Sequence, residues 1–125
     1  MIFDTDILIW VQRGNEKAAH LLDLAERKFI SIQTLMELLQ GARNKAEHQI
    51  IKLLLSQQNF STLPLTQSIG HRALAYIEEY SLAYGLLSQD ALIAATAAEH
   101  GLTLATGNSK HFKCIKDIQL KIFRP

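Results

Sequence analysis

Apolar residues along the chain fall into short continuous runs that alternate with longer segments of helical periodicity. The short runs predict strands, because turn and capping residues bound them. They cover Ile2–Asp4, Phe29–Ile32, Asn59–Leu63, Leu102–Thr106 and Ile118–Phe123, the last at a sheet edge. Strands that alternate with helices predict an α/β fold, a three-layer α/β/α sandwich with a short, mostly parallel five-stranded sheet. We expect residues 1–125 to form a single domain.

Helices are predicted where apolar residues recur about one turn apart. They cover Ile7–Gln12, Glu16–Lys28, Thr34–Ala42, Ala46–Gln57, Gln67–Tyr80, Gln89–His100 and Lys110–Phe112. Polar residues at the start of these segments predict the caps. We expect Asp6 to cap the first helix and Ser88 to cap the helix that begins at Gln89. Thr34 and Glu37 have the spacing of a capping box.

The composition narrows the classes of protein. Hydrophobic residues make up 48% and charged residues 20%, as in ordinary globular proteins. The net charge of +1 gives no overall basic signature of a nucleic-acid binder, although a local basic surface is compatible with it. Cys114 is the only cysteine, which excludes an internal disulfide and a thiolate zinc cluster. Without a signal peptide or a membrane-length apolar run, we expect a cytoplasmic protein.

Four polar residues occupy positions that a parallel sheet brings to one rim. Asp4 ends the first strand, and Glu37 lies about one turn into the helix after the second. Asp90 lies in the first turn of its helix, and Asn108 follows the fourth strand, two residues after Thr106. Because the carboxyl ends of parallel strands share one side, we expect these residues to meet. A carboxylate such as Asp4, on an otherwise apolar element, is costly unless it is paired or holds a metal.

The residue types indicate a chemistry. Three carboxylates within a few ångströms cannot all stay ionised without a cation. Oxygen ligands without cysteines or paired histidines favour a hard ion, Mg²⁺ or Mn²⁺. Such an ion lowers the pKa of bound water and stabilises charge on a phosphate during in-line displacement. Asp4, Glu37 and Asp90 together therefore suggest phosphodiester hydrolysis.

Each of these residues also has a purely structural interpretation. Asp6 fits a helix cap, and Glu37 fits a capping box. Asp90 would favour the dipole of its helix, and Asn108 suits a Gly-Asn-Ser turn. Asp4 is the hardest to explain in this way, because it interrupts an apolar passage from strand to helix. The joint pattern is more specific than any of its members.

Other polar residues carry weaker signals. No two histidines have the i, i+4 spacing of a zinc helix, and His111 alone lies beside the proposed site. Cys114 has no identifiable partner for a nucleophilic role. Arg13, Arg43 and Lys110 are candidates to hold a polyanionic substrate, although solvated surface positions are the simpler interpretation.

Four motifs follow one another along the chain. They are Ile2-Phe-Asp-Thr-Asp-Ile-Leu-Ile9, Ser31-Ile-Gln-Thr-Leu-Met-Glu-Leu38 with Gly41, Gln89-Asp-Ala-Leu-Ile-Ala-Ala-Thr-Ala97, and Leu104-Ala-Thr-Gly-Asn108 with Phe112. In this order they resemble the motifs of PIN-domain proteins, and most closely the VapC-like toxins of bacterial toxin–antitoxin pairs. The resemblance spans nearly the whole chain. Each motif alone is weak, but four in order are specific.

The resemblance implies a PIN-like fold and an endoribonuclease that depends on Mg²⁺ or Mn²⁺ and hydrolyses RNA phosphodiester bonds. The implied partners are the RNA substrate, a cognate antitoxin whose C-terminal segment covers the site, and a second copy in a homodimer. The residues that match the family's catalytic positions are Asp4, Glu37, Asp90 and Asn108, the first three as metal ligands, with Asp6 and Thr106 in support.

Two positions depart from the family pattern. Gly107 stands where many relatives carry a basic residue, which removes one phosphate contact. Asn108 is neutral, so it cannot supply a full charge to a second metal. Both departures weaken the case for two tightly bound ions without removing the three-acid site.

Other classes of function stay open at this point. Asp4-Thr-Asp6 also resembles the first motif of haloacid-dehalogenase-type phosphatases, whose first Asp is a nucleophile. That family needs a Thr or Val in place of Leu8 and a late acidic pair, where this chain has Gly107-Asn108. A receiver domain would need an Asp at the end of its third strand, and the chain has none there. A catalytically silent PIN-fold binding module is a further alternative.

Overall fold

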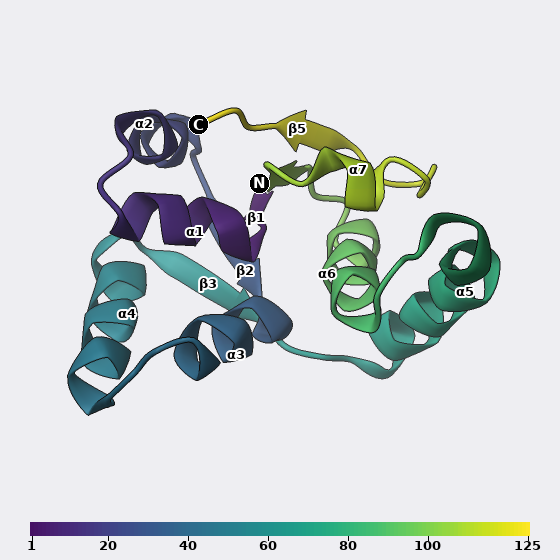
Figure 1. The fold of residues 1–125 in the computed structure, drawn as a ribbon, viewed down its shortest axis with the longest axis horizontal. Helices are drawn as coiled ribbons and strands as arrows, with labels where there is room; N and C mark the ends of the chain where they lie inside the picture. Colours follow the sequence, from purple (N-terminus) through teal and green to yellow (C-terminus); the bar gives the residue numbers. More distant parts are fainter.

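The computed structural model describes all of residues 1–125, and its strands join one sheet (Figure 1). The elements in chain order are β1 (Ile2–Phe3), α1 (Thr5–Gln12), α2 (Glu16–Leu24), β2 (Lys28–Ser31), α3 (Ile32–Gln40), α4 (Lys45–Gln57), β3 (Phe60–Leu63), α5 (Gln67–Tyr84), α6 (Ser88–Glu99), β4 (Leu104–Thr106), α7 (Ser109–Phe112) and β5 (Leu120–Ile122). The strand order is β3-β2-β1-β4-β5, and every neighbouring pair is parallel. The predicted α/β fold with a five-stranded sheet is confirmed, and β5 lies at an edge as expected.

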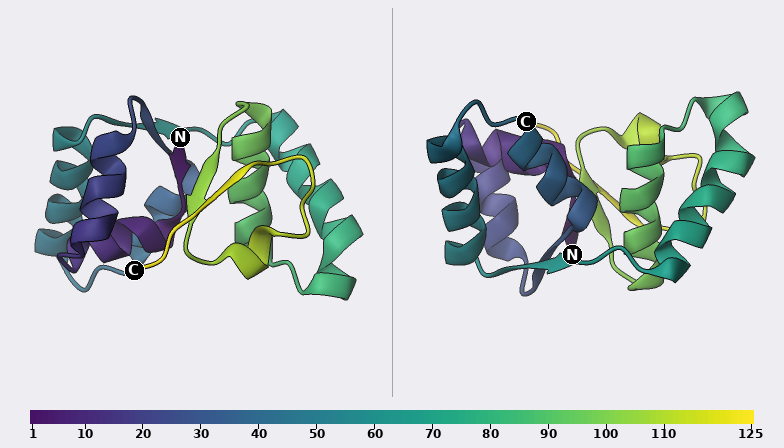
Figure 2. Two further views of the ribbon diagram at one scale, coloured as in Figure 1. Left: turned by 90° about the horizontal axis from the view of Figure 1, so that it is seen from above. Right: turned by 90° about the horizontal axis from the view of Figure 1, so that it is seen from below.

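Different helices cover the two faces of the sheet, because successive side chains of a strand point to opposite faces. On one face, Ile2 and Leu104 pack with buried residues of α5 and α6. On the other face, Phe3 and Ala105 pack with buried residues of α1, α2, α3 and α4. Figures 1 and 2 show α1–α4 gathered on one side of the strands and α5 with α6 on the other. Burial on both faces therefore fixes the strands between two helix layers.

The central strand β1 marks the point at which the chain changes direction across the sheet. β2 and β3 follow on one side of it, and β4 and β5 on the other. Such a switch point leaves a crevice at the carboxyl ends of the two central strands. Asp4 directly follows β1, and Thr106 is the last residue of β4. The sheet order thus brings together two residues 102 positions apart in the chain.

The predicted cap of the first helix is wrong. Helix α1 begins at Thr5, and Asp4 is its N-cap, with Oδ1 accepting the N–H of Thr5 at 2.8 Å. Asp6 lies inside the first turn rather than ahead of it. The strand passes into the helix without a loop, so the carboxylate that ends β1 also caps α1.

The other two predicted caps are also wrong. Ser31 caps α3, and its Oγ accepts the N–H of Thr34 at 3.0 Å, so Thr34 and Glu37 form no capping box. Ser88 is the first residue of α6, and Leu87 takes the cap position without a side-chain hydrogen bond. In α3, as in α1, the last strand residues connect directly to the helix, which moves its start toward the strand.

Several element bounds differ from the sequence prediction. Helix α2 ends at Leu24 rather than Lys28, because Lys28 already pairs with β3 as the first residue of β2. Helix α5 continues to Tyr84 and ends at Gly85, whose φ of 70° is the left-handed conformation that glycine tolerates. Strand β4 is shorter than predicted and begins at Leu104. These shifts leave the order of the elements unchanged.

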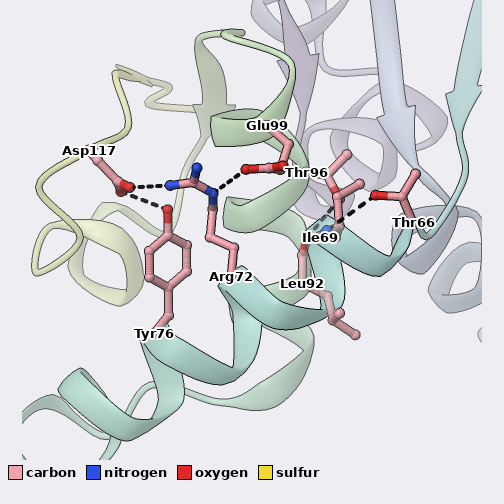
Figure 3. A network of polar contacts seen from close by, with 8 residues as sticks. All are labelled: Thr66, Ile69, Arg72, Tyr76, Leu92, Thr96, Glu99 and Asp117. Atoms are coloured by element: carbon pink, nitrogen blue, oxygen red, sulfur yellow. Dashed lines mark hydrogen bonds and ion pairs between the residues drawn. The ribbon is translucent and has the colours of Figure 1, made fainter.

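A polar network ties the segment after α7 to the helices behind it (Figure 3). The guanidinium of Arg72 in α5 forms ion pairs with Glu99 of α6 and with Asp117. Asp117 also accepts the phenol hydroxyl of Tyr76 at 2.7 Å. The network fixes the course of the chain between α7 and β5.

None of the helices combines the length and apolar character that crossing a membrane requires.

Candidate active site

Asp4 is the most buried carboxylate of the chain, with 5% of its surface exposed. Its Oδ1 accepts the N–H of Thr5, and its Oδ2 accepts the hydroxyl of Thr106 at 2.7 Å. Burial raises the pKa of Asp4 to about 7, and the nearby charge of Asp6 adds to this rise. The two hydrogen bonds act in the opposite direction, and Asp90 adds a smaller rise. Asp4 therefore sits where its charged form is unfavourable in the absence of a cation.

Asp6 holds the turn that follows β4. Its Oδ2 accepts the backbone N–H of Gly107 at 2.9 Å, while its Oδ1 is buried and has no hydrogen-bond partner. Burial raises the pKa of Asp6, and the N–H of Gly107 opposes this effect. A buried oxygen without a partner is costly, and a cation or a shared proton would stabilise it.

Glu37 reaches this corner from α3. Its Oε2 accepts the hydroxyl of Thr5 at 2.7 Å, and its Oε1 accepts the side-chain amide of Gln33 at 3.0 Å. Thr5 directly follows Asp4, so one hydroxyl connects the acid of α3 to the start of α1. Neither Thr5 nor Gln33 was predicted as a site residue from the sequence. Their signals were the place of Thr5 between two acids and the i, i+4 spacing of Gln33 and Glu37.

Asp90 lies in the first turn of α6, as expected, and faces α7. Its Oδ2 lies 3.3 Å from Nδ1 of His111. Burial raises the pKa of Asp90, the neighbouring His111 lowers it, and the charge of Glu37 raises it again. The charge of Glu37 therefore reaches Asp90, and the charge of Asp90 reaches Asp4, across the carboxyl ends of the strands.

Thr106 connects Asp4 to the turn after β4. The fully buried hydroxyl donates to Asp4 and accepts the backbone N–H of Asn108 at 2.9 Å. Asn108 is exposed, and its side chain makes no capping bond to α7. The amide of Asn108 is therefore presented at the rim, where a ligand can contact it.

The predicted residues gather at one rim, but their side chains do not form a finished ligand cage. No group of three Asp, Glu, His or Cys side chains in the chain could hold one ion as it stands. Glu37 is turned toward Thr5 and Gln33, and Asp90 toward His111. Both side chains are thus already engaged by protein groups. The donor set itself, carboxylate oxygens beside an unpartnered buried oxygen, fits a hard divalent ion.

Glu37 lies between two hollows of different character. A polar hollow of about 310 Å³ opens between α3 and the start of α6, lined by Gln33, Glu37, Gln40, Ser88, Gln89 and Leu92. An apolar groove of about 760 Å³ runs between α1, α3 and α4; its main apolar residues are Ile9, Leu38, Ile50, Ile51, Leu53 and Leu54. Arg13 and Arg43 also line this groove. The site thus has one polar and one apolar approach.

Comparisons with known proteins identify the family of the chain. A family model described as PIN domain matches residues 1–117. The ribonuclease VapC10 of Mycobacterium tuberculosis is 32% identical over 123 residues, which cover 95% of this chain and 90% of that protein. A toxin–antitoxin complex from Klebsiella pneumoniae contains a chain that is 35% identical, with a TM-score of 0.80 and coverage of 94% of this chain and 93% of that chain.

A more distant structure shows the shared fold alone. VapBC2 of Rickettsia felis is 24% identical, with a TM-score of 0.83 over 99% of this chain and all of that chain. The matched family is the PIN domain, not the haloacid-dehalogenase phosphatases with which the first motif was also compatible. The resemblance of the four motifs is confirmed: the chain belongs to the PIN-domain family and, within it, to the VapC-type ribonuclease toxins.

Proposed function

We propose that this ribonuclease hydrolyses RNA phosphodiester bonds with a divalent ion, Mg²⁺ or Mn²⁺, at the carboxyl rim of the sheet. The observation that carries the proposal is the buried Asp4, whose pKa is raised to about 7 beside Asp6 and Asp90. A site that stores this much unfavourable negative charge is suited to a cation. The proposal makes one domain of residues 1–125 the catalytic unit.

Each residue of the rim has a role in this proposal. Asp4, Glu37 and Asp90 would hold the ion, directly or through water. The hydroxyl of Thr106 orients Asp4, because it donates a hydrogen bond to Oδ2 of Asp4. The same hydroxyl is itself held in place, because its oxygen accepts the N–H of Asn108. The side chain of Asn108 would orient the phosphate or a water. When bound, the ion would activate water and stabilise negative charge on the phosphate.

The direct test is RNA cleavage with a matched pair of carboxylate variants. With Mg²⁺ or Mn²⁺ the protein should cleave cellular RNA, and EDTA should abolish cleavage. Asp90→Asn removes one ligand charge without changing size, so we expect a loss of at least about 10³-fold. Asp23→Asn, on the exposed surface of α2, should stay within about twofold.

The competing functions predict other results. A phosphatase would hydrolyse p-nitrophenyl phosphate, which we expect to remain intact. A silent binding module would cleave nothing at any metal concentration. Full cleavage by Asp90→Asn would show that the rim is not the active site.

We propose further that the apolar groove receives a segment of a cognate antitoxin. Ile50 and Leu53 of α4 are 61% and 56% exposed although they line this groove, which is the state of an uncovered docking surface. The same groove reaches Glu37, so an occupant would cover one approach to the acids. The Klebsiella pneumoniae relative was solved as a toxin–antitoxin complex, which supports a partner of this class.

The groove can be separated from the chemistry by mutation. Leu53→Asp places a charge in the groove without touching the acids, so RNA cleavage should persist while inhibition by the partner is lost. Size-exclusion chromatography with the co-expressed partner gives the binding readout. Lys52→Asp, one position away on the exposed side of α4, is the matched control and should retain the partner.

We also propose a homodimer. Several large apolar side chains of α5 and of the turn after it are exposed, namely Leu74, Leu82, Tyr84 and Leu87. Exposed apolar surface of this kind is typical of interaction sites. Sedimentation analysis of Leu82→Asp, a residue that is fully exposed here, tests whether a second copy covers it. The cytoplasmic location remains a prediction.

A further inference from the structure

Positive charge is concentrated in the last twenty residues, after β4. Residues 106–125 contain five of the thirteen lysines and arginines and one of the twelve acids, so their net charge is +4. The remaining 105 residues have a net charge of −3. The overall charge of +1 therefore conceals an uneven distribution of charge along the chain. The five cations are Lys110, Lys113, Lys116, Lys121 and Arg124.

These cations are exposed and form no ion pair with any carboxylate of the chain. The one acid among them, Asp117, is already bound by Arg72 and Tyr76 (Figure 3). The two other residues considered for holding a polyanion, Arg43 and Arg13, already have partners within the chain. Arg43 pairs with Glu47 at 2.9 Å, and the guanidinium of Arg13 lies 5.7 Å from the centre of the Trp10 ring. Unpaired exposed cations are the ones that a polyanion can recruit.

Two of the five flank the active-site turn from different elements. Lys110 is in α7, two residues after Asn108. Arg124 follows Phe123, whose N–H donates to the carbonyl of Thr106 at 2.8 Å. Figure 2 shows the C-terminal segment crossing one face of the molecule, with α7 beside its path. Lys110 and Arg124 therefore belong to two different segments that both border the turn of residues 106–108.

The turn itself does not accommodate a basic side chain at position 107. A Cβ at Gly107 would lie 2.5 Å from Oδ2 of Asp6, which accepts the Gly107 N–H. Any side chain at this position would disturb the contact by which Asp6 holds the turn. A positive charge next to Asn108 must consequently come from neighbouring elements.

We propose that Lys110 and Arg124 bind the RNA phosphodiester backbone on the two sides of the 106–108 turn. The inference rests on the proposed ribonuclease function and specifies how its substrate is held. A phosphate chain fits this surface because the cations are exposed and unpaired and lie in segments that border the turn of Thr106 and Asn108. Lys113, Lys116 and Lys121 add to the attractive field along the same segment.

The test compares two double variants that remove the same charges. Lys110→Ala with Arg124→Ala removes the flanking cations. Arg27→Ala with Lys52→Ala removes one exposed arginine and one exposed lysine from the amino end of β2 and from α4. Binding of a fluorescein-labelled, unstructured 20-nucleotide RNA is measured by anisotropy in EDTA at several salt concentrations.

We expect the first double variant to bind the RNA about tenfold more weakly. The slope of log K against log salt concentration should become less steep by about 1.4, the value for two lost phosphate contacts to a single strand. The control should change by less than about twofold. With Mg²⁺, KM for RNA cleavage should rise while kcat changes little. Equal weakening in both variants, or unchanged binding in the first, would overturn the proposal. Binding is measured without metal, so this outcome is independent of whether the wild-type protein cleaves RNA.

Discussion

The two ends of the sheet are built on opposite principles. At the carboxyl end, Asp4 and Thr106 bury polar groups at the centre of the molecule. At the amino end, a hollow of about 660 Å³ is lined largely by apolar residues, among them Met1, Leu24, Phe29 and Leu102. On β4 the transition takes two residues, from the fully buried Leu104 to the fully buried Thr106. One end contributes mainly to the stability of the fold, and the other holds the acids of the proposed site.

This difference shows what the acid cluster costs. Apolar burial stabilises without any further partner, whereas a buried carboxylate stabilises only with a proton, a donor or a cation. The buried carboxylates of the carboxyl rim therefore destabilise the fold, and apolar burial at the amino end and in the two helix layers offsets this effect. Substitutions at the two ends should separate stability from activity, in opposite directions.

The largest effect on stability is expected at the amino end. Leu104→Ala leaves a cavity between β1, α6 and β5 and should lower the free energy of unfolding by about 2–5 kcal/mol. Urea denaturation measures this loss, and RNA cleavage per folded molecule should stay unchanged. Leu24→Ala, at a residue that is 67% exposed, is the control and should cost far less. A large loss of activity in folded Leu104→Ala would remove the division between the two ends.

The next effect is the pH dependence of the metal-free protein. The pKa of Asp4 is about 7 in the folded state against an ordinary value of 3.8, so the folded chain binds the extra proton between these values. The stabilising contribution of Asp4 is complete below about pH 4 and is lost as the pH rises through about 7. Asp4→Asn removes this titration and should be more stable than the wild type at pH 7.5, by roughly 1–3 kcal/mol.

Thermal unfolding in EDTA from pH 4 to pH 8 checks this expectation. Asp6 and Asp90 have pKa values shifted in the same direction, so the slope should shrink in Asp4→Asn rather than vanish. Asp23→Asn should keep the wild-type slope. If Asp4→Asn is the less stable protein at pH 7.5, the buried charge is not a cost to the fold.

A smaller effect is expected from the hydroxyl that orients Asp4. Thr106→Val keeps the shape of the side chain but removes the donor to Asp4 and the acceptor of the Asn108 N–H. The loss should lower the free energy of unfolding by about 1–2 kcal/mol. Because the Thr106 hydrogen bond lowers the pKa of Asp4, its loss should move the acid limb of the cleavage pH profile to higher pH. Thr103→Val removes only an exposed contact of 3.4 Å to Gln119 and should move neither quantity. An unshifted profile in Thr106→Val would mean that Asp4 does not limit the rate.

The smallest effect distinguishes two glycines at opposite ends of β4. Gly101→Ala places a side chain at a φ of 62°, which should cost about 1 kcal/mol and leave cleavage unchanged. Gly107→Ala puts a Cβ against Asp6 and should lower activity severalfold, with a similar or smaller loss of stability. Parallel denaturation and cleavage measurements on both variants give the comparison. Equal activity in the two would show that the contact between Asp6 and Gly107 has no role in the reaction.

Much of the architecture could be predicted from the sequence, because it depends on apolar periodicity. The runs that begin at Ile2 and Leu104 are continuous and apolar because both faces of their strands are buried, so they predict strands without reference to their neighbours. Caps were harder to assign. Asp6 has good capping chemistry, but β1 lies closer to α1 than the local pattern shows, so Asp4 takes that place. Ser88 also has good capping chemistry, but α6 begins one residue earlier than predicted, so Leu87 stands at the cap position.

The placement of the proposed site residues could be predicted from the sequence, but the direction of their side chains could not. Asp4, Glu37 and Asp90 were expected near the carboxyl ends of the strands, and they lie there in the structure. Their role in catalysis stays a prediction. The inward turn of Glu37 toward Thr5 depends on a distance between α1 and α3 that no local pattern contains. The contact of Asp90 with His111 likewise depends on how α6 and α7 pack.

The central place of β1 also has a consequence for synthesis on the ribosome. The strand emerges early, and β2 is available to pair with it soon afterwards, but its other neighbour, β4, is made near the end of the chain. Until then Asp4 lacks the Thr106 hydroxyl, and the α6 residue Asp90 has no α7 beside it. A nascent chain therefore lacks the assembled rim, and if the rim is the active site, as proposed, RNA cleavage begins only after almost the entire protein has been made.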